Sequence, residues 1–343
     1  MAAFLRNVWY MIGWSEELGD GLLARRIADR PTVFFRKADG SVAALLDRCP
    51  HRFAPLSRGE RDGDRIVCGY HGLTFDAAGA CVRNPFSDKI PAGARVDSWL
   101  CEERDGIIWM WGGAAEEADH DAIPDFAVVR DQPGRKVLRG YTLVRAPYEF
   151  CTDNLLDLSH IEFVHRGTFA GDGVIFAGKH SVIDEGATLH SNWWMPGVAA
   201  PLPTRPPFAE GELTDHWLDM RWNAPASMRL DIGATRPGRP REEGFQVGGQ
   251  AHIVTPETAT TAHYFTANAR HENIDSVEVD EFLRTLFAQA FDVEDKPMIE
   301  ASYARMEAPD FWAAKPLSLG IDQGGTRARR KIEAMLKAES QGG

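Results

Sequence analysis

The chain has 343 residues, of which 44% are hydrophobic and 26% charged, as is ordinary for a globular protein. This length favours two domains, each able to bury a core of its own. The net charge of −12 and the pI near 5.4 argue against binding to a nucleic-acid backbone, which requires a basic surface.

The N-terminus and the cysteines indicate where the protein works. No apolar run approaches the roughly 20 residues that a membrane span requires. The apolar start of the chain contains Arg6 and has no small-residue cleavage site, so we expect neither a signal peptide nor a membrane anchor. An odd number of cysteines without a leader does not indicate a disulfide framework. We therefore expect a cytoplasmic protein in which Cys81, Cys101 and Cys151 serve packing.

The first 111 residues alternate short apolar runs with Gly, Pro and Asp turns, as in "PTVFFRK", "VAALLD" and "GIIWMWG". This spacing predicts an all-β domain over residues 1–111. Residues 112–135 are polar and carry Gly and Pro, so they are expected to form a linker.

Residues 136–343 are expected to form a second domain. Strand-like segments such as "KVLRGYTLVRA", "DHWLDMRWNA" and "TAHYFTANA" follow one another up to residue 270. From Ser276, placed as an N-cap, apolar residues recur at helical spacing, and Pro297 should kink or restart that helix. The tail "TRARRKIEAMLKAES" predicts a charged terminal helix. The order of elements predicts an α+β protein.

The first candidate site is a pair of Cys/His loops. Cys49-x-His51 is followed, after sixteen residues, by Cys68-x-x-His71. Two readings fit these residue types: a Cys₂His₂ zinc site, or a Rieske [2Fe–2S] cluster with two thiolates on one iron and two imidazoles on the other. Each loop supplies one Cys and one His, as a dinuclear cluster held between two loops requires.

This segment resembles the Rieske family, whose motif is C-x-H-x(15–17)-C-x-x-H. Rieske proteins of cytochrome complexes have two further cysteines in these loops, and Ala54 and Tyr70 stand at the corresponding positions here. The resemblance is therefore to the oxygenase and ferredoxin type, which passes electrons onward.

The second candidate site is the stretch "DNLLDLSHIEFVH", from Asp153 to His165. Asp157 and His160 share a helical face, but His165 lies about 140° further around an ideal helix. The helix must unwind or end near His165 if both imidazoles are to meet one metal. Two imidazoles and one carboxylate would form the facial triad of non-haem Fe(II) oxygenases.

The whole chain resembles the oxygenase component of Rieske non-haem iron monooxygenases, in the group of vanillate O-demethylase, dicamba O-demethylase and toluenesulfonate methyl-monooxygenase. The motif D-N-L-x-D-x-x-H-x-x-x-x-H matches from Asp153. The resemblance implies that His160 and His165 bind iron. It also implies that Asp157 relays electrons from the cluster histidine of one subunit to an iron histidine of the next, within a homotrimer. Asn154, one turn before Asp157, is expected near the iron.

The resemblance places the third iron ligand, a carboxylate, in the late helix. Asp295 aligns best, with Asp292 and Glu294 as alternatives that a solvated helix face would also explain. It also implies a helix-grip-like catalytic domain, in which an antiparallel sheet is flanked by helices.

Substrate-binding residues are expected on the strands between the helices. The resemblance places His252 against substrate, and Leu230 or Asp231 stands where relatives have a polar residue. Leu286, Phe287 and Phe291 are apolar candidates for contact with an aromatic ring, although their helical spacing also fits a core.

The sequence thus predicts the terminal component of an oxygenase that monooxygenates a small aromatic acid, by oxidative O-demethylation. The cofactors are one [2Fe–2S] cluster and one mononuclear Fe(II) per chain. The chain lacks a Rossmann G-x-G-x-x-G, so a separate flavin- or ferredoxin-containing reductase should supply electrons from NAD(P)H. The alternatives are hydroxylation of a methyl group or of the aromatic ring and, more remotely, a non-catalytic Rieske electron carrier.

Overall fold

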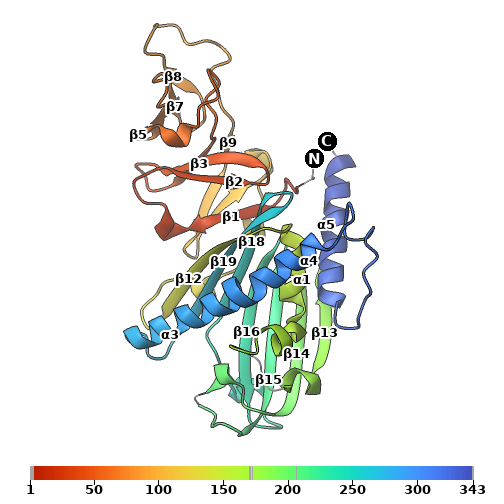
Figure 1. Ribbon diagram of the computed structural model, residues 1–343. Helices are drawn as coiled ribbons and strands as arrows, with labels where there is room; N and C mark the ends of the chain where they lie inside the picture. Colours follow the sequence, from red (N-terminus) through yellow and green to blue (C-terminus); the bar gives the residue numbers. More distant parts are fainter. Residues whose placement is uncertain (1–3, 170, 172, 206, 342–343) are drawn as a thin grey trace. The chain divides into compact units, whose positions relative to one another are not determined.

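The computed structural model describes residues 4–169, 171, 173–205 and 207–341. This part of the chain divides into two compact units. The first takes the residues up to 125 together with 255–259 and 338–341, and the second takes the remaining residues between 126 and 337. Figure 1 colours the chain from red at the N-terminus to blue at the C-terminus.

The first unit is built from three small antiparallel sheets, as the alternation of strands and turns predicts. In sheet order the strands are β1 (Trp9–Trp14), β11 (Ile107–Trp111) and β10 (Cys101–Arg104); β2 (Leu23–Ile27), β3 (Arg30–Arg36), β4 (Val42–Leu46) and β9 (Ser98–Trp99); and β5 (Glu60–Asp62), β6 (Arg65–Val67), β7 (Thr74–Asp76) and β8 (Cys81–Arg83).

The strands of this unit form where β-branched and aromatic residues run together. All five residues of β11, with the sequence IIWMW, are buried, as are all six of β1, which pairs with it. The two Cys/His loops lie at the ends of short strands, one after β4 and one between β6 and β7. The buried strands therefore give these loops a rigid base.

The second unit is a single large sheet covered by helices. Neighbouring strands run antiparallel in every pair whose residue-to-residue register is described. Across the sheet they are β12 (Lys136–Val144), β19 (Thr261–Arg270), β18 (Gln250–Thr258), β16 (Ser227–Thr235), β15 (Leu213–Asn223), β14 (Thr188–Ala199) and β13 (Lys179–Asp184), with β17 (Phe245–Gln246) beside β16.

The helices of this unit gather on one side of the sheet, where Figure 1 shows α1, α3 and α4 lying across the strands. The helices are α1 (Tyr148–Leu156), α2 (Ile161–Val164), α3 (Val277–Ala288), α4 (Lys296–Ala304) and α5 (Gln323–Gln341). This arrangement confirms the predicted α+β class with an antiparallel sheet and flanking helices.

Two sequence signals set the course of the late helices. The Ser276 side chain accepts a hydrogen bond from the Val279 amide at 3.2 Å, so the predicted N-cap is confirmed. Pro297 lies in the first turn of α4, where its missing N–H costs nothing, so the helix restarts there. Between α3 and α4 the backbone forms a π-helix, Gln289–Asp295, which the sequence pattern does not announce.

Candidate active site

The chain is interrupted twice between Asp153 and His165, and these interruptions bring two histidines together. Helix α1 ends at Leu156, and Asp157 leaves the helical region with φ −118° and ψ 83°. One 3₁₀ turn, Leu158–His160, leads into α2, which ends at Val164 with His165 as its C-cap. The rings of His160 and His165 lie 5.2 Å apart between centroids. The expected end of the helix at His165 is present, and the break at Asp157 adds a second change of direction.

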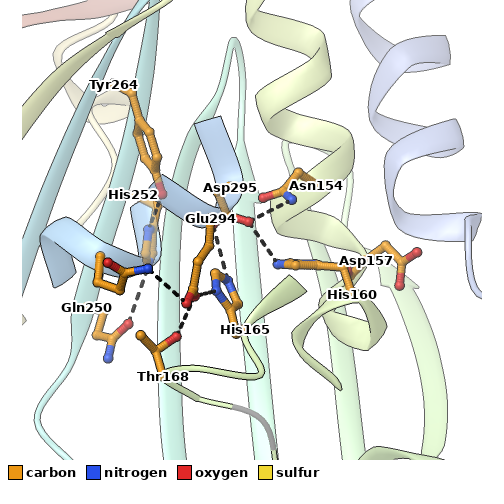
Figure 2. A network of polar contacts seen from close by, with 11 residues as sticks. Asn154, Asp157, His160, His165, Thr168, Gln250, His252, Tyr264, Glu294 and Asp295 are labelled. Carbon is orange, nitrogen blue, oxygen red and sulfur yellow. Dashed lines mark hydrogen bonds and ion pairs between the residues drawn. The ribbon is translucent and has the colours of Figure 1, made fainter. Parts of the chain in front are cut away.

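Asp295 joins the two histidines from the other end of the sequence (Figure 2). Its Oδ1 lies 3.5 Å from His160 Nε2, and its Oδ2 lies 3.3 Å from His165 Nε2. One ligand atom from each of the three side chains lies within 4.8 Å of the others. Among the residues that the structure describes, this is the only such group of three His, Cys, Asp or Glu side chains.

The π-helix decides which carboxylate faces the histidines. π-turns are rare and occur often at functional sites, because one extra residue per turn changes which side chains point inward. Here Asp295, 2% exposed, faces both rings, while Glu294 approaches His165 from the side. Asp292, the third candidate, is exposed.

Each histidine is oriented by a hydrogen bond from its other ring nitrogen. His160 Nδ1 donates to the backbone carbonyl of Asp157 at 2.6 Å. His165 Nδ1 donates to Glu294 Oε2 at 2.8 Å, and Thr168 Oγ1 donates to the same oxygen at 2.6 Å. Both Nε2 atoms are therefore left for a shared ligand, which is the usual way that proteins fix metal-binding imidazoles.

Asn154 completes the surroundings of Asp295, because its Nδ2 donates to Asp295 Oδ1 at 3.2 Å. The sequence placed Asn154 near the iron site, and its side chain lies beside the carboxylate. The broken helix thus supplies a hydrogen-bond donor as well as two imidazoles.

The charges of this group suit a divalent metal. Burial lowers the pKa of His160, so its imidazole is neutral. Burial also opposes charge on His165, but hydrogen bonds to Asp295 and Glu294 outweigh it and raise the pKa of His165. Burial disfavours the charge on Asp295 as well, yet the two histidines together hold the pKa of Asp295 below its ordinary value. Two imidazoles and one carboxylate on one side of the site fit non-haem iron.

The carboxylate of Asp157 does not contact His160. It accepts hydrogen bonds from the Ser159 amide at 3.0 Å and the Ser159 hydroxyl at 2.6 Å, and it points away from the His160 ring (Figure 2). Asp157 also lines a surface groove of about 340 Å³ together with Trp312 and Arg330. The backbone carbonyl of Asp157 therefore orients His160, while the carboxylate of Asp157 faces the surface.

The two Cys/His loops of the first unit share one backbone design. Phe53 N–H donates to the Cys49 carbonyl at 2.9 Å, and Gly72 N–H donates to the Cys68 carbonyl at 2.9 Å. Both Phe53 (φ 62°) and Gly72 (φ 73°) take the left-handed conformation that closes such a turn. The loops therefore present their Cys/His pairs in the same way.

Thiols and imidazoles are segregated between these loops. Cys49 and Cys68 are each 2% exposed, and burial, together with the neighbouring Cys68 thiol, raises the pKa of Cys49 to about 11 although backbone N–H groups of the loop oppose this. His51 and His71 lie nearer the surface with ring centroids 4.5 Å apart.

The segregation decides between the two readings of the loops. A zinc site needs four ligand atoms around one point, and these four side chains do not form a group of the kind that His160, His165 and Asp295 form in the described chain. Two buried thiols on one side and two imidazoles on the other fit the two irons of a Rieske cluster.

A cavity of about 100 Å³ lies beside the triad, between the sheet and the broken helix. Its wall is mostly apolar and includes Leu230, Met220 and Phe291. His252 also lines it, with Nδ1 2.7 Å from the Tyr264 hydroxyl and Nε2 3.3 Å from Gln250 Oε1. Burial lowers the pKa of His252 to about 4.

Two residues that the sequence put forward for substrate contact lie elsewhere. Asp231 points to the other side of the sheet from Leu230 and pairs with Arg229 at 3.0 Å. Leu286 is half-buried on α3 and does not belong to the described lining of the cavity. The stacked rings of Phe287 and Phe291, 5.9 Å apart, bring only Phe291 to this wall.

Several residues of the site were not singled out from the sequence. Gln250 and Tyr264 form hydrogen bonds with His252, and Thr168 donates to Glu294, the carboxylate that orients His165. His216 lines the cavity from β15. Gln250 and His252 are two residues apart on β18, so they lie on the same face of the sheet. This period of two was the only signal in the sequence, and it does not show which face of the sheet lines a cavity.

None of the helices in the described part of the chain is both long enough and apolar enough to cross a bilayer.

Two known families match this chain. The family described as "Vanillate O-demethylase oxygenase C-terminal domain" matches residues 144–338, and the "Rieske [2Fe-2S] domain" matches residues 8–96. The first match contains both histidines and the aspartate of the triad, and the second contains both Cys/His loops.

Relatives of similar length match the chain over almost its whole length. The oxygenase component of dicamba O-demethylase from Stenotrophomonas maltophilia is 38% identical, over 98% of this chain and 99% of its own. The oxygenase component of chloroacetanilide N-alkylformylase from Rhizorhabdus wittichii is 36% identical, over 98% and 97%. The crystal structure of dicamba monooxygenase bound to dicamba superposes with a TM-score of 0.89 at 37% identity, covering 99% of this chain and 100% of the other.

These relatives are oxygenase components, so a separate reductase partner is implied for their class. The cofactors of the class are a [2Fe–2S] cluster and a mononuclear iron, and the donor sets described above fit both. The chain belongs to the Rieske non-haem iron oxygenases, as an oxygenase component of the vanillate O-demethylase type.

Proposed function

We propose that this chain inserts one oxygen atom of O₂ into a C–H bond of a small aromatic substrate, and that this bond belongs to a methoxy group. The observation that carries the proposal is the buried triad of His160, His165 and Asp295 beside an apolar cavity. Support for demethylation comes from relatives whose names state it for dicamba and vanillate. The acid group predicted for the substrate stays a prediction.

The reaction balances as an oxidative demethylation. One oxygen atom of O₂ enters the methyl C–H bond and the other leaves as water, with two electrons that come from NAD(P)H through the reductase. The resulting hemiacetal breaks its C–O bond and releases formaldehyde and a phenol. The bound iron would supply the activation of O₂ that organic side chains cannot provide.

The residues of the chain divide this work. Cys49, His51, Cys68 and His71 would hold the cluster. His160, His165 and Asp295 would hold the iron beside the cavity that takes the substrate. The apolar wall excludes bulk water and positions the ring.

Electron transfer is proposed to pass between subunits of a homotrimer. Asp157, whose carboxylate lines the surface groove, would accept a hydrogen bond from a cluster histidine of the partner subunit. Its backbone carbonyl already holds His160, so a single residue would link the two centres. The cytoplasmic location stays a prediction beside this one.

Methyl hydroxylation is the second candidate, because a relative named for toluene-4-sulfonate monooxygenation is 33% identical over 98–99% of both chains. Ring hydroxylation has no comparable observation in its favour. The non-catalytic carrier is not a candidate, because residues 144–338 match an oxygenase domain.

The proposed function is tested by a product screen. The chain is supplied with a surrogate reductase, NADH and a series of methoxylated and methylated aromatic compounds, and formaldehyde and hydroxylated products are measured. Formaldehyde released in equal amount to the phenol supports demethylation. A hydroxymethyl product without formaldehyde would replace it by methyl hydroxylation.

The triad is tested by iron content. Wild-type protein should hold about three iron atoms per chain, two in the cluster and one in the triad. His160→Ala should lower this to about two, with an unchanged visible spectrum of the cluster. If the variant keeps its full iron content and turns over, the triad is not the iron site.

A further inference from the structure

One wall of the cavity is a row of side chains on the central strands of the sheet. His216, Leu218 and Met220 of β15 alternate along the strand and all line the cavity, as do Leu230 and Ile232 of β16. Met220 pairs with Leu230, and Leu218 pairs with Ile232. His216 is thus the single polar side chain in a row that is otherwise aliphatic.

The ring of His216 has one nitrogen committed and one available. Its exposed fraction is 4%, and Nδ1 donates to the backbone carbonyl of Gly233 at 2.8 Å. That bond fixes the proton on Nδ1 and leaves a lone pair on Nε2. Burial lowers the pKa of His216 to about 4, so the ring is neutral near pH 7.

The surroundings of Nε2 offer it no partner within the part of the chain that the structure describes. The strand neighbours of His216 are Met195 on β14 and Ala234 on β16. The described lining of the cavity contains no lysine or arginine. A lone pair that faces a mostly apolar cavity has no donor to bond with, and a ligand that brings a donor would satisfy it.

His216 lies at the end of the cavity that is remote from the triad. Gln250 and His252 mark the near end, since His252 packs edge-on against Phe291 in the same π-helix as Asp295. On neighbouring strands Gln250 pairs with Leu230, and Leu230 pairs with Met220. His216 lies on β15 four residues before Met220. At about 3.3 Å per residue this is roughly 13 Å, the length of a substituted aromatic ring with one side group.

We propose that His216 Nε2 selects the substrate, by accepting a hydrogen bond from an uncharged O–H or N–H group at the end of the molecule remote from the oxidised carbon. This inference rests on the proposed function and names its substrate class. An ionised carboxylate at this end would meet a lone pair and an apolar wall, so the preferred substrates are neutral aromatic amides or alcohols. This differs from the sequence-based prediction of an aromatic acid, because a carboxylate is disfavoured at the His216 end of the cavity.

The selectivity follows from the cost of an unmatched polar group. A neutral hydrogen bond contributes about 0.5–1.5 kcal/mol net, and a site built for a donor rejects a ligand that lacks one by more than the bond itself is worth. A tenfold or greater preference for a donor over its methyl-capped analogue is therefore expected, since about 1.4 kcal/mol corresponds to a factor of ten.

The test compares three probes on one scaffold: 4-methoxybenzamide, its N,N-dimethyl amide and 4-methoxybenzoate. Their dissociation constants for the full iron-loaded chain are measured by equilibrium dialysis without reductase. Wild type should bind the primary amide about tenfold more tightly than the dimethyl amide, and more tightly than the benzoate. Equal affinity for the two amides, tightest binding of the benzoate, or no detectable binding of the primary amide would overturn the proposal.

Variants separate the hydrogen bond from the size of the probe. In His216→Leu the two amides should bind within about twofold of each other, and His216→Gln, whose amide oxygen accepts, should keep part of the preference. His190→Leu is the matched control: His190 lies on β14 beside Glu185 and does not line the cavity, so the wild-type ratio should remain. An unchanged ratio in His216→Leu would overturn the proposal, and if that variant does not fold, the wild-type and His216→Gln ratios still decide it.

The dialysis and turnover measurements test the role of His216 and the proposed demethylation separately. Dialysis requires no electrons, so a correct order of affinities with no formaldehyde from any probe would reject demethylation and leave His216 as a binding residue. Formaldehyde release that is equal for the two amides would keep demethylation and reject the role of His216.

Discussion

Glu294 lies beside the proposed iron site and orients one of its histidines. Its carboxylate accepts from His165 Nδ1 and from Thr168, so it holds the imidazole in place and increases its basicity. Burial disfavours its charge, but the hydrogen bonds from Thr168 and His165 lower the pKa of Glu294 below its ordinary value. An ionised partner at this position would stabilise the ring when a metal is bound.

Replacement of this carboxylate should weaken iron binding without removing a ligand. Glu294→Gln is expected to lower the affinity of the triad for Fe(II) by about 10–100-fold, measured by titration with a chelator. Asp292→Asn is the matched control, because it removes the same charge from an exposed position of the same π-helix. Equal losses in the two variants would show a general effect of charge instead.

The burial of His216 predicts how the free energy of unfolding depends on pH. Its pKa is lowered from 6.5 to about 4 by burial, so the unfolded chain takes up a proton between these values while the folded chain does not. The stability that this residue contributes is present above pH 6.5 and is lost as the pH falls toward 4, by about 2 kcal/mol between pH 7.5 and 5.0.

Urea unfolding of wild type and His216→Gln at these two pH values measures this contribution. The variant should lose about 2 kcal/mol less than wild type over the same interval. Parallel losses would mean that the His216 ring is protonated in the folded protein at pH 5.0, and therefore not buried as described.

At the scale of elements, the π-helix Gln289–Asp295 is the feature on which the triad depends. It directs Asp295 toward both histidines and Glu294 toward His165 alone, although the two residues are adjacent. The π-turn has more residues per turn than an α-helix, so adjacent side chains differ in direction by less than the about 100° of an α-helix.

The same elements show what a sequence can and cannot predict. The strand-rich second domain and the cap at Ser276 follow from local patterns, so they were predictable. The antiparallel sheet was implied by the family resemblance, and the end of a helix near His165 followed from the condition that both imidazoles meet one metal. The choice among Asp292, Glu294 and Asp295 depends on a backbone register that helical periodicity does not encode. His216 was missed because a strand histidine looks the same in sequence whether its neighbour is solvent or a cavity.

At the scale of the whole molecule, the proposed relay through Asp157 can be tested with mixed oligomers. Chains that lack the cluster (Cys68→Ser) and chains that lack the iron (His160→Ala) should each be inactive alone. If electrons cross between subunits of a random trimer, coexpression of equal amounts should restore about a quarter of wild-type turnover, since each subunit contact has that chance of being productive. No activity in the mixture would confine the relay to single chains.

The same mixture contains its own control for Asp157. Asp157→Asn placed in the iron-holding, cluster-free chain should abolish the restored turnover, because that chain supplies the residue beside the working His160. The same change in the iron-free chain should have no effect. Equal effects in both chains would assign Asp157 to assembly.

The acceptors that fix the histidine protons differ in one further respect. His160 and His216 both donate from Nδ1 to backbone carbonyls, those of Asp157 and Gly233, whereas His165 donates to the side chain of Glu294. A main-chain carbonyl is present whatever residue occupies the position. The hydrogen bonds that fix the tautomers of His160 and His216 therefore do not depend on the side chains at positions 157 and 233. A single substitution at Glu294 can therefore change the electron donation of His165, whereas the other two imidazoles stay the same when residues around the cavity are replaced.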